Sequence, residues 1–188
     1  MIDYIKDELN LHLEVIKNTI ASSNLGIEKA ADEIVSSLRL GGKLIIFGNG
    51  GSAADAQHMA AEFTGRFLID RKALAAIALT TDTSALTAIA NDFGYENIFS
   101  RQIDAICQKN DVVLGITTSG NSLNIINGIK AAEKIGCRTI GLTGNGGGDM
   151  ADLVNTIIDI PSKDTPRIQE MHILIIHILC GIAEKELS

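Results

Sequence analysis

The first forty residues carry two runs of apolar side chains at the spacing of a helix. Apolar residues that recur every three or four positions form one face of a helix. They do so here at Ile5, Leu9, Leu13 and Ile16, and again at Ala30, Ala31, Ile34, Val35 and Leu38. Gly41 and Gly42 then end the second run, as glycine does at helix C-termini. The sequence therefore predicts two helices before the first strand.

Residues 44–47 then run apolar without polar alternation, and further strands are predicted at residues 75–79, 111–116, 138–142 and 153–160. Continuous apolar strands are typical of a sheet covered on both faces. Strands that alternate with helices predict the α/β class, here a doubly wound, parallel five-stranded sheet. No linker or repeat interrupts the pattern, so we expect one domain over residues 1–188. The two leading helices and the final helix, residues 166–187, lie outside the alternation, and we expect their apolar faces to pack against other copies.

The composition excludes several classes of protein. With 46% apolar and 21% charged residues in 188 positions, the chain is not disordered. A net charge of −7 argues against a nucleic-acid partner, because clustered Lys and Arg bind phosphate backbones. No segment predicts a signal peptide or a membrane span. Cys107, Cys137 and Cys180 form no C-x-x-C pair and are interpreted as buried thiols, which predicts a cytoplasmic protein.

Two turns at predicted strand ends have the composition of a phosphate site. In an open α/β sheet, ligands bind at the carboxyl ends of the strands. The first turn, residues 48–52, is rich in glycine and precedes a helix whose N-terminus favours an anion. The second carries hydroxyls on Thr117, Thr118, Ser119 and Ser122. Either turn alone has a plainer explanation, since Ser52 can cap its helix and Ser and Thr form ordinary turns. Together they predict a phosphate monoester as ligand.

A dinucleotide-binding fingerprint is formally present at the first turn. Gly48, Gly50 and Ala53 have the required spacing after a strand, and Asp70 follows about twenty residues later. The fingerprint also needs a second strand that ends at the acidic residue. Residues 66–70 make a poor strand that ends against Arg71. A nicotinamide cofactor is therefore disfavoured.

Two helices carry candidate catalytic or metal-binding side chains. His58 and Glu62 are four residues apart, which places them one turn apart on one helix face. The final helix, with Thr165 as its expected N-cap, carries Gln169 and His177. Plainer interpretations stay open here. His58 and Glu62 can form a solvated pair, and His177 can be an ordinary core residue of its apolar run.

These motifs resemble the bacterial phosphoheptose isomerase family over essentially the whole chain. The resemblance rests on residues 48–62 (GNGGSAADAQHMAAE), 91–94 (NDFG), 117–122 (TTSGNS) and 167–170 (RIQE), together with His177. The glycine and serine turns are common to sugar-isomerase (SIS) proteins, a flavodoxin-like group. His58, Glu62, Gln169 and His177 together are more specific. The chain departs from some members at Thr165-Pro166, where they carry an acidic residue.

The resemblance implies an isomerase that converts sedoheptulose 7-phosphate to D-glycero-D-manno-heptose 7-phosphate through an ene-diol, for lipopolysaccharide or capsule synthesis. It implies Glu62 and His177 as the acid/base pair and one Zn²⁺ per subunit. The implied zinc ligands are His58, Glu62, Gln169 and His177. The implied substrate-binding residues are Asn49, Gly50, Gly51, Glu62, Asn91, Asp92, Thr117, Thr118, Ser119, Ser122 and Gln169.

The implied zinc ligands predict an active site that copies of the chain share. Gln169 and His177 are separated by about 12 Å along a straight helix, whereas zinc–ligand distances are about 2.0–2.2 Å. A second copy is therefore expected to supply one ligand, and the resemblance implies a homotetramer.

Two rival functions remain. SIS relatives include non-catalytic phosphosugar-binding adaptors that associate with the replication initiator, but an adaptor has no need for His177 opposite Glu62. Pentose 5-phosphate isomerases usually carry an extra regulatory domain, for which 188 residues leave no room. Both features favour the heptose isomerase.

Overall fold

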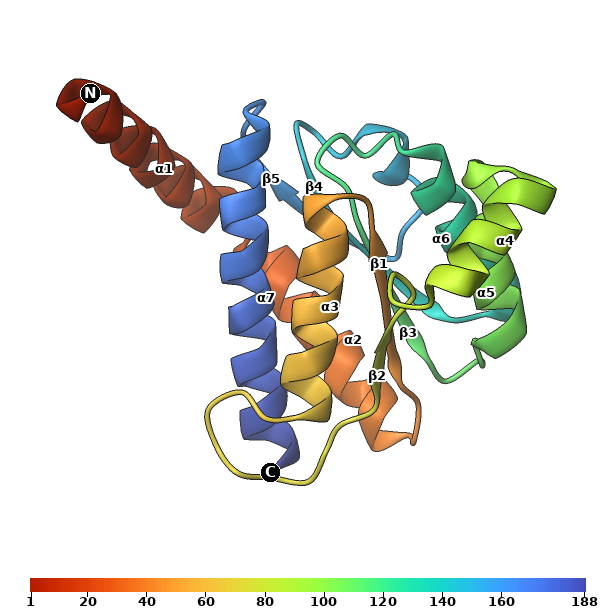
Figure 1. Ribbon diagram of the computed structural model, residues 1–188. Coiled ribbons are helices and arrows are strands. Elements are labelled where there is room, and N and C mark those ends of the chain that lie inside the picture. The colour runs from red at the N-terminus through yellow and green to blue at the C-terminus, as the bar shows by residue number, and fades with distance from the viewer.

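A parallel sheet forms the centre of the computed structural model, which describes residues 1–188 (Figure 1). Its five strands lie in the order β2-β1-β3-β4-β5, and every neighbouring pair is parallel. This confirms the predicted doubly wound sheet in its flavodoxin-like order. The last strand is shorter than expected, because residues 153–155 belong to the preceding turn. The strands are β1 (Leu44–Gly48), β2 (Ala76–Ala78), β3 (Val112–Ile116), β4 (Arg138–Gly144) and β5 (Thr156–Ile160).

Seven α-helices surround the sheet. They are α1 (Ile2–Ser22), α2 (Asn24–Arg39), α3 (Gly51–Thr64), α4 (Thr83–Phe93), α5 (Ser100–Ile106), α6 (Leu123–Ile135) and α7 (Thr165–Leu187). The sequence analysis missed α4 and α5. The start of α4 has a recognisable signal, because the Asp82 carboxylate caps it by accepting a hydrogen bond from the Ala85 backbone N–H at 2.9 Å.

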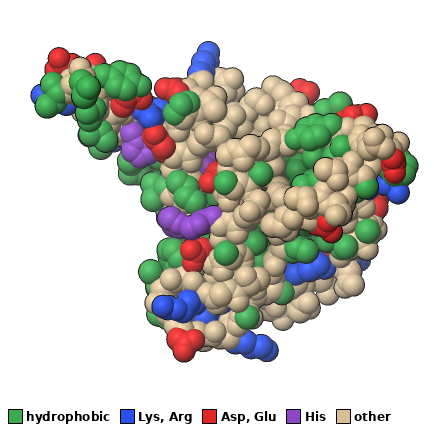
Figure 2. All heavy atoms as spheres, viewed as in Figure 1, with side chains coloured by type: hydrophobic (Ala, Val, Ile, Leu, Met, Phe, Trp, Pro, Cys, Tyr) green, Lys and Arg blue, Asp and Glu red, His purple; other side chains and the backbone are tan.

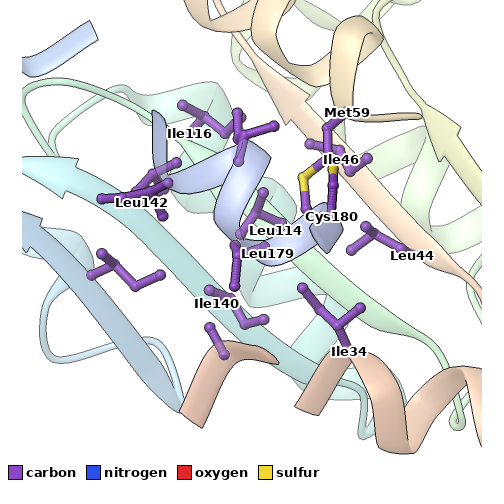
Figure 3. Close-up of a cluster of buried hydrophobic side chains, with 14 of the residues drawn as sticks. Ile34, Leu44, Ile46, Met59, Leu114, Ile116, Ile140, Leu142, Leu179 and Cys180 are labelled. Atoms are coloured by element: carbon purple, nitrogen blue, oxygen red, sulfur yellow. The ribbon is translucent and has the colours of Figure 1, made fainter. Parts of the chain in front are cut away.

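Alternate residues of β1 point into two separate cores. Leu44 and Ile46 belong to a core shared with α2, α3 and α7, whereas Ile45 and Phe47 face α5 and α6. Figure 3 shows the first core, in which Leu179 of α7 lies among strand side chains. Helices on both faces explain why β1 is buried at every position and shows no polar alternation.

The expected outward packing of three helices is wrong for two of them. The apolar faces of α2 and α7 are mostly used inside the chain, with Ile34, Ile176 and Leu179 in the first core. In contrast, α1 projects from the body (Figure 1) and buries only Val15 and Thr19. Figure 2 shows hydrophobic side chains gathered on this projecting helix. Its large exposed apolar residues are Ile2, Tyr4, Ile5, Leu9, Leu11, Leu13 and Ile20.

Both expected helix caps differ in the structure. The N-cap of α7 is Asp164, and Thr165 is already helical. The N-cap of α3 is Gly50, so Ser52 lies inside the helix and is buried there. Gly50 has a φ of 57°, a backbone conformation that favours glycine. The glycine turn therefore enters its helix earlier than the sequence suggested.

All three cysteines are free thiols. Cys137 and Cys180 are buried as expected, but Cys107 is only half-buried, with its Sγ 3.0 Å from that of Cys137. No helix has both the length and the apolar character needed to cross a membrane.

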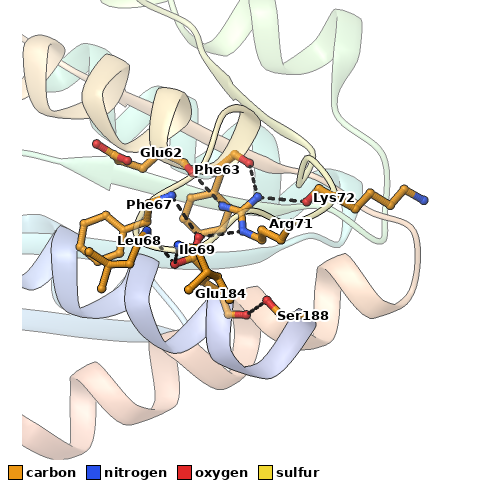
Figure 4. A network of polar contacts seen from close by, with 9 residues as sticks. All are labelled: Glu62, Phe63, Phe67, Leu68, Ile69, Arg71, Lys72, Glu184 and Ser188. Atoms are coloured by element: carbon orange, nitrogen blue, oxygen red, sulfur yellow. Dashed lines mark hydrogen bonds and ion pairs between the residues drawn. The ribbon is translucent and has the colours of Figure 1, made fainter.

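A buried carboxylate near the end of α7 fixes the segment that follows α3 (Figure 4). Glu184 accepts hydrogen bonds from the backbone N–H groups of Phe67, Leu68 and Ile69 at 3.0, 2.8 and 3.1 Å. It also pairs with Arg71 Nε at 3.1 Å. Burial raises the pKa of Glu184, but these donors outweigh it and hold the pKa below its usual value. The far end of the chain thus determines the path of this segment.

Arg71 extends the same network to the end of α3. Its Nη2 donates to the backbone carbonyl of Glu62 at 2.8 Å, and its Nη1 donates to that of Phe63 at 3.0 Å. Carbonyls at a helix C-terminus lack partners within the helix. Arg71 therefore satisfies the last turn of α3, which carries Glu62.

We predict that Glu184→Gln destabilises the fold strongly, because it leaves Arg71 buried without its counter-charge and turns an amide group toward backbone N–H donors. The measurement is the midpoint of denaturant unfolding at neutral pH. The matched control is Glu186→Gln, since Glu186 pairs with Arg39 at 3.0 Å while both side chains are more than half exposed. The control should unfold near the wild-type midpoint. Equal midpoints for the two variants would contradict a structural role for the Glu184 network.

Candidate active site

The two predicted turns lie side by side at one edge of the sheet. β1 and β3 pair in parallel, with Gly48 opposite Ile116 at their carboxyl ends. The strand order changes direction between these strands, and ligands bind at such a switch point. Residues 49–51 leave β1 there, and residues 117–122 leave β3. The structure therefore brings together the two turns that the sequence singled out.

The glycine turn makes close contacts that a side chain would prevent. A Cβ atom at Gly48 would lie 2.6 Å from the backbone oxygen of Ser52, and one at Gly51 would lie 2.6 Å from Gln169 Nε2. Gln169 of α7 therefore lies against the first turn of α3. This places it beside the predicted sugar-binding residues Asn49, Gly50 and Gly51.

The hydroxyl turn after β3 is compact. Thr117 Oγ1 lies 3.1 Å from Ser122 Oγ and 3.4 Å from Ser119 Oγ. Ser122 is the N-cap residue of α6, but its hydroxyl makes no capping hydrogen bond. Its hydroxyl therefore faces Thr117 within the turn instead of capping the helix, unlike that of an ordinary capping serine. Thr118 is half-buried in the same turn.

A second cluster joins α3 to α7. His58 Nε2 lies 2.9 Å from His177 Nε2 and 3.4 Å from Glu62 Oε1. The Phe67 ring stacks on His177, with 5.5 Å between centroids and 27° between planes. His177 is therefore not a core residue, and the His58–Glu62 pair is not a purely solvated one. Within one chain, the structure thus brings together the predicted acid/base pair and three of the four predicted zinc ligands.

The chemistry of these side chains suits zinc, although their present geometry is that of a hydrogen-bonded pair. Two imidazole nitrogens and one carboxylate oxygen are zinc donors, and ligand atoms on a tetrahedral ion stand about 3.3 Å apart. The His58–Glu62 distance of 3.4 Å fits this spacing, whereas the histidine nitrogens, at 2.9 Å, are too close. No group of three or more His, Cys, Asp and Glu side chains is already arranged around a metal position.

One predicted zinc ligand, Gln169, and two predicted sugar-binding residues, Asn91 and Asp92, do not join this cluster. Gln169 is at the glycine turn, and α7 runs as one helix from Thr165 to Leu187, so this chain's Gln169 does not join His177. Asn91 Nδ2 donates to Asp92 Oδ1 at 2.8 Å near the exposed end of α4. No hydrogen bond links Asn91 or Asp92 to the glycine turn.

Two titratable groups near the site, the half-buried Asp55 and the buried His172, have shifted pKa values. Burial raises the pKa of the Asp55 carboxyl, and the nearby His58 partly opposes this. Burial lowers the pKa of His172 to about 4, despite a backbone hydrogen bond with the Thr143 carbonyl at 3.0 Å. His172 is therefore neutral at pH 7 and donates this bond, which attaches α7 to the end of β4.

Sequence reasoning missed several residues that shape the site. Phe67 and Arg71 lie in residues 66–71, which the sequence analysis considered only as a possible strand of a dinucleotide-binding unit. No feature of the neighbouring sequence indicates that Glu184 binds this segment. Tyr95 and Asn124 both hydrogen-bond Asn49. They lie just after the 91–94 and 117–122 motifs, and this proximity was the one available signal.

Comparison with known proteins agrees with the geometry. Residues 9–144 match the SIS domain family. The chain is 54% identical to a phosphoheptose isomerase of Aliarcobacter butzleri over 96% of both proteins. Two solved phosphoheptose isomerases superimpose closely: that of Neisseria gonorrhoeae has a TM-score of 0.92 at 41% identity, over 97% of this chain and 98% of that one. That of Francisella tularensis has a TM-score of 0.94 at 35% identity, over 98% of both chains.

The two solved structures match over nearly the whole chain, and the curated relative matches over 96% of its length. The relatives are enzymes by name, which disfavours the adaptor alternative. From its motifs, its fold and these similarities, the chain belongs to the phosphoheptose isomerase family of SIS domain proteins.

Proposed function

We propose that the chain is a sedoheptulose 7-phosphate isomerase that acts by acid/base chemistry through an ene-diol. One observation supports this most directly: His58, Glu62 and His177 gather on two packed helices, with contacts of 2.9 and 3.4 Å. Aldose–ketose isomerisation needs a base for a carbon-bound proton and an acid for the neighbouring oxygen. A carboxylate beside two imidazoles provides both.

Glu62 is suited to the role of base. Its carboxylate points from α3 toward His58, and its side chain is only 22% exposed. His177 is suited to deliver and recover the proton at the substrate oxygens, because its Nε2 already shares a hydrogen bond with His58. Phe67 covers one face of the His177 ring and fixes its plane.

The phosphate end is assigned to the turn after β3. The hydroxyls of Thr117, Ser119 and Ser122 lie within 3.4 Å of one another, and Thr118 adds a fourth. They provide donors for phosphate oxygens without a Lys or Arg. The α6 N-terminus follows at once and favours an anion. Asn49, Gly50, Gly51 and Gln169 are assigned to the sugar, and Asn91 and Asp92 to its far end.

A zinc ion is part of the proposal. His58, Glu62 and His177 would hold it, after the two rings separate by about half an ångström to reach ligand spacing. When bound, it would polarise the substrate carbonyl and stabilise negative charge on the oxygen. Gln169 of this chain lies against Gly51, so the fourth protein ligand is assigned to Gln169 of another copy.

A homotetramer with shared sites is supported by two features. α1 exposes a row of apolar side chains on a helix that projects from the body. Apolar faces of this kind usually mark an interface, and soluble oligomers are mostly symmetric. The unsatisfied fourth ligand gives a second reason for copies to meet. We place the enzyme in the cytoplasm, supplying heptose precursors for lipopolysaccharide or capsule.

We predict that the purified protein converts sedoheptulose 7-phosphate to an aldose phosphate and loses turnover after treatment with a chelator. Product formation is followed by NMR, and zinc is added back as the control for loss of the ion. Absence of turnover with zinc present would contradict the proposed function. Full turnover after verified metal removal would contradict the zinc assignment alone.

We predict that Ser119→Ala raises KM for the sugar phosphate about threefold to tenfold, because one donor to the phosphate is lost. The inhibition constant of inorganic phosphate should rise by the same factor. Ser36→Ala is the matched control, since Ser36 is exposed on α2 away from the turn. Unchanged affinity for both ligands would remove the hydroxyl turn from phosphate binding.

Subunit mixing tests the shared site. Because His58, Glu62 and His177 come from one chain, the informative pair is Glu62→Gln with Gln169→Ala. Co-refolded tetramers of two impaired variants should regain part of the wild-type activity, since some sites then combine an intact cluster with an intact Gln169. Verified mixed tetramers without any recovery would show that each chain completes its own site.

A further inference from the structure

Three side chains form a hydrogen-bonded chain between the glycine turn and the hydroxyl turn. Asn124 Nδ2 donates to Asn49 Oδ1 at 2.8 Å, and Asn49 Nδ2 donates to Asn124 Oδ1 at 2.9 Å. The Tyr95 hydroxyl lies 3.0 Å from the same Asn49 Oδ1. Asn124 is buried, with 3% of its surface exposed, two residues after Ser122 of the hydroxyl turn. Asn49 directly follows β1.

A backbone group fixes the orientation of the whole chain of amides. The Ile125 N–H donates to Asn124 Oδ1 at 3.0 Å. A backbone N–H can only donate, so the atom it meets must be the oxygen of Asn124. Asn124 Nδ2 then faces Asn49, which fixes Asn49 Oδ1 as an acceptor. The Tyr95 hydroxyl must in turn donate its proton to that oxygen.

The result is that Asn49 has no acceptor left for a ligand. Its Oδ1 already accepts from Asn124 and Tyr95, which uses both lone pairs. Its Nδ2 gives one N–H to Asn124, and no hydrogen bond within the chain uses the second. Asn49 and Tyr95 also line a hollow of about 240 Å³, together with Gly50 and Thr80.

We propose that Tyr95 and Asn124 are positioning residues that make Asn49 a donor-only contact to an acceptor oxygen on the substrate carbon chain. The inference rests on the isomerase function proposed above. A group that can only donate binds an oxygen more strongly as that oxygen gains negative charge. Asn49 therefore stabilises the ene-diolate oxygen more than the carbonyl of the bound substrate.

Asn124 adds a constraint on distance. It is buried at the start of α6, and its neighbours Ser119 and Ser122 carry the phosphate hydroxyls. Its paired hydrogen bonds with Asn49 hold the donor at a fixed separation from the phosphate turn. The Asn49–Asn124 pair therefore sets the distance between the reactive oxygen and the phosphate, and this distance favours sugar phosphates of one chain length.

A double-mutant cycle tests the role of Tyr95. Tyr95→Phe removes only the hydroxyl, which frees a lone pair on Asn49 Oδ1 and removes one of the hydrogen bonds that hold its amide in place. We expect kcat/KM for sedoheptulose 7-phosphate to fall about threefold to tenfold in the wild-type background. In an Asn49→Ala background the same change should cost less than about twofold, because the group being positioned is absent. The Kd of inorganic phosphate should stay at the wild-type value.

Ser36→Ala is the control, since it also removes a single hydroxyl and Ser36 is exposed on α2, away from the two turns. Equal losses in both backgrounds, or a parallel loss of phosphate affinity, would overturn the positioning role. The Kd of sedoheptulose 7-phosphate is measured by calorimetry beside turnover. If the wild-type protein binds sedoheptulose 7-phosphate but does not convert it, the isomerase function is contradicted. The role of Tyr95 is then decided by the double-mutant cycle measured on the Kd of the sugar phosphate.

Discussion

The parallel pairing of β1 with β3 is the constraint on which the site depends. The chain leaves both strands at the same edge, so a turn without side chains and a turn of hydroxyls become neighbours. Helices on both faces bury β1 completely and leave no freedom in its register. The Asn49–Asn124 amide pair then connects the two turns directly. The substrate site is therefore as rigid as the sheet itself at its phosphate end.

The acid/base residues are positioned by a different interaction, the packing of α3 against α7. These helices bring His58 within 2.9 Å of His177, although the residues are far apart in the sequence. Glu184 and Arg71 stabilise the same pair of helices. Glu184 binds the backbone N–H of Phe67, whose ring stacks on His177, and Arg71 donates to the last carbonyls of α3. A buried ion pair contributes little net stability, but it specifies one arrangement because a lone charge there is costly. Here the arrangement it specifies is the orientation of the acid/base residues.

The sheet could be predicted from the sequence because uninterrupted apolar strands such as 44–47 and 111–116 have few other uses. The helices α4 and α5 were missed because their apolar stripes are short and broken by polar residues. Within the site, the turns and the His58–Glu62 spacing are local signals. The rise of a straight helix was enough to predict that Gln169 and His177 of one chain do not meet, and α7 is indeed unbroken between them. The Glu184 network, Tyr95 and Asn124 could not be found, because their partners become neighbours only through the fold.

In the proposed reaction, Glu62 removes a carbon-bound proton of the substrate, and His177 transfers protons at the substrate oxygens. Exchange of that proton with solvent deuterium, followed by NMR of sedoheptulose 7-phosphate in D₂O, tests this most directly. The account predicts that the wild-type protein introduces deuterium next to the carbonyl, and that Glu62→Gln binds the sugar phosphate with near-normal Kd but introduces none. Deuterium incorporation by Glu62→Gln at the wild-type rate would contradict it.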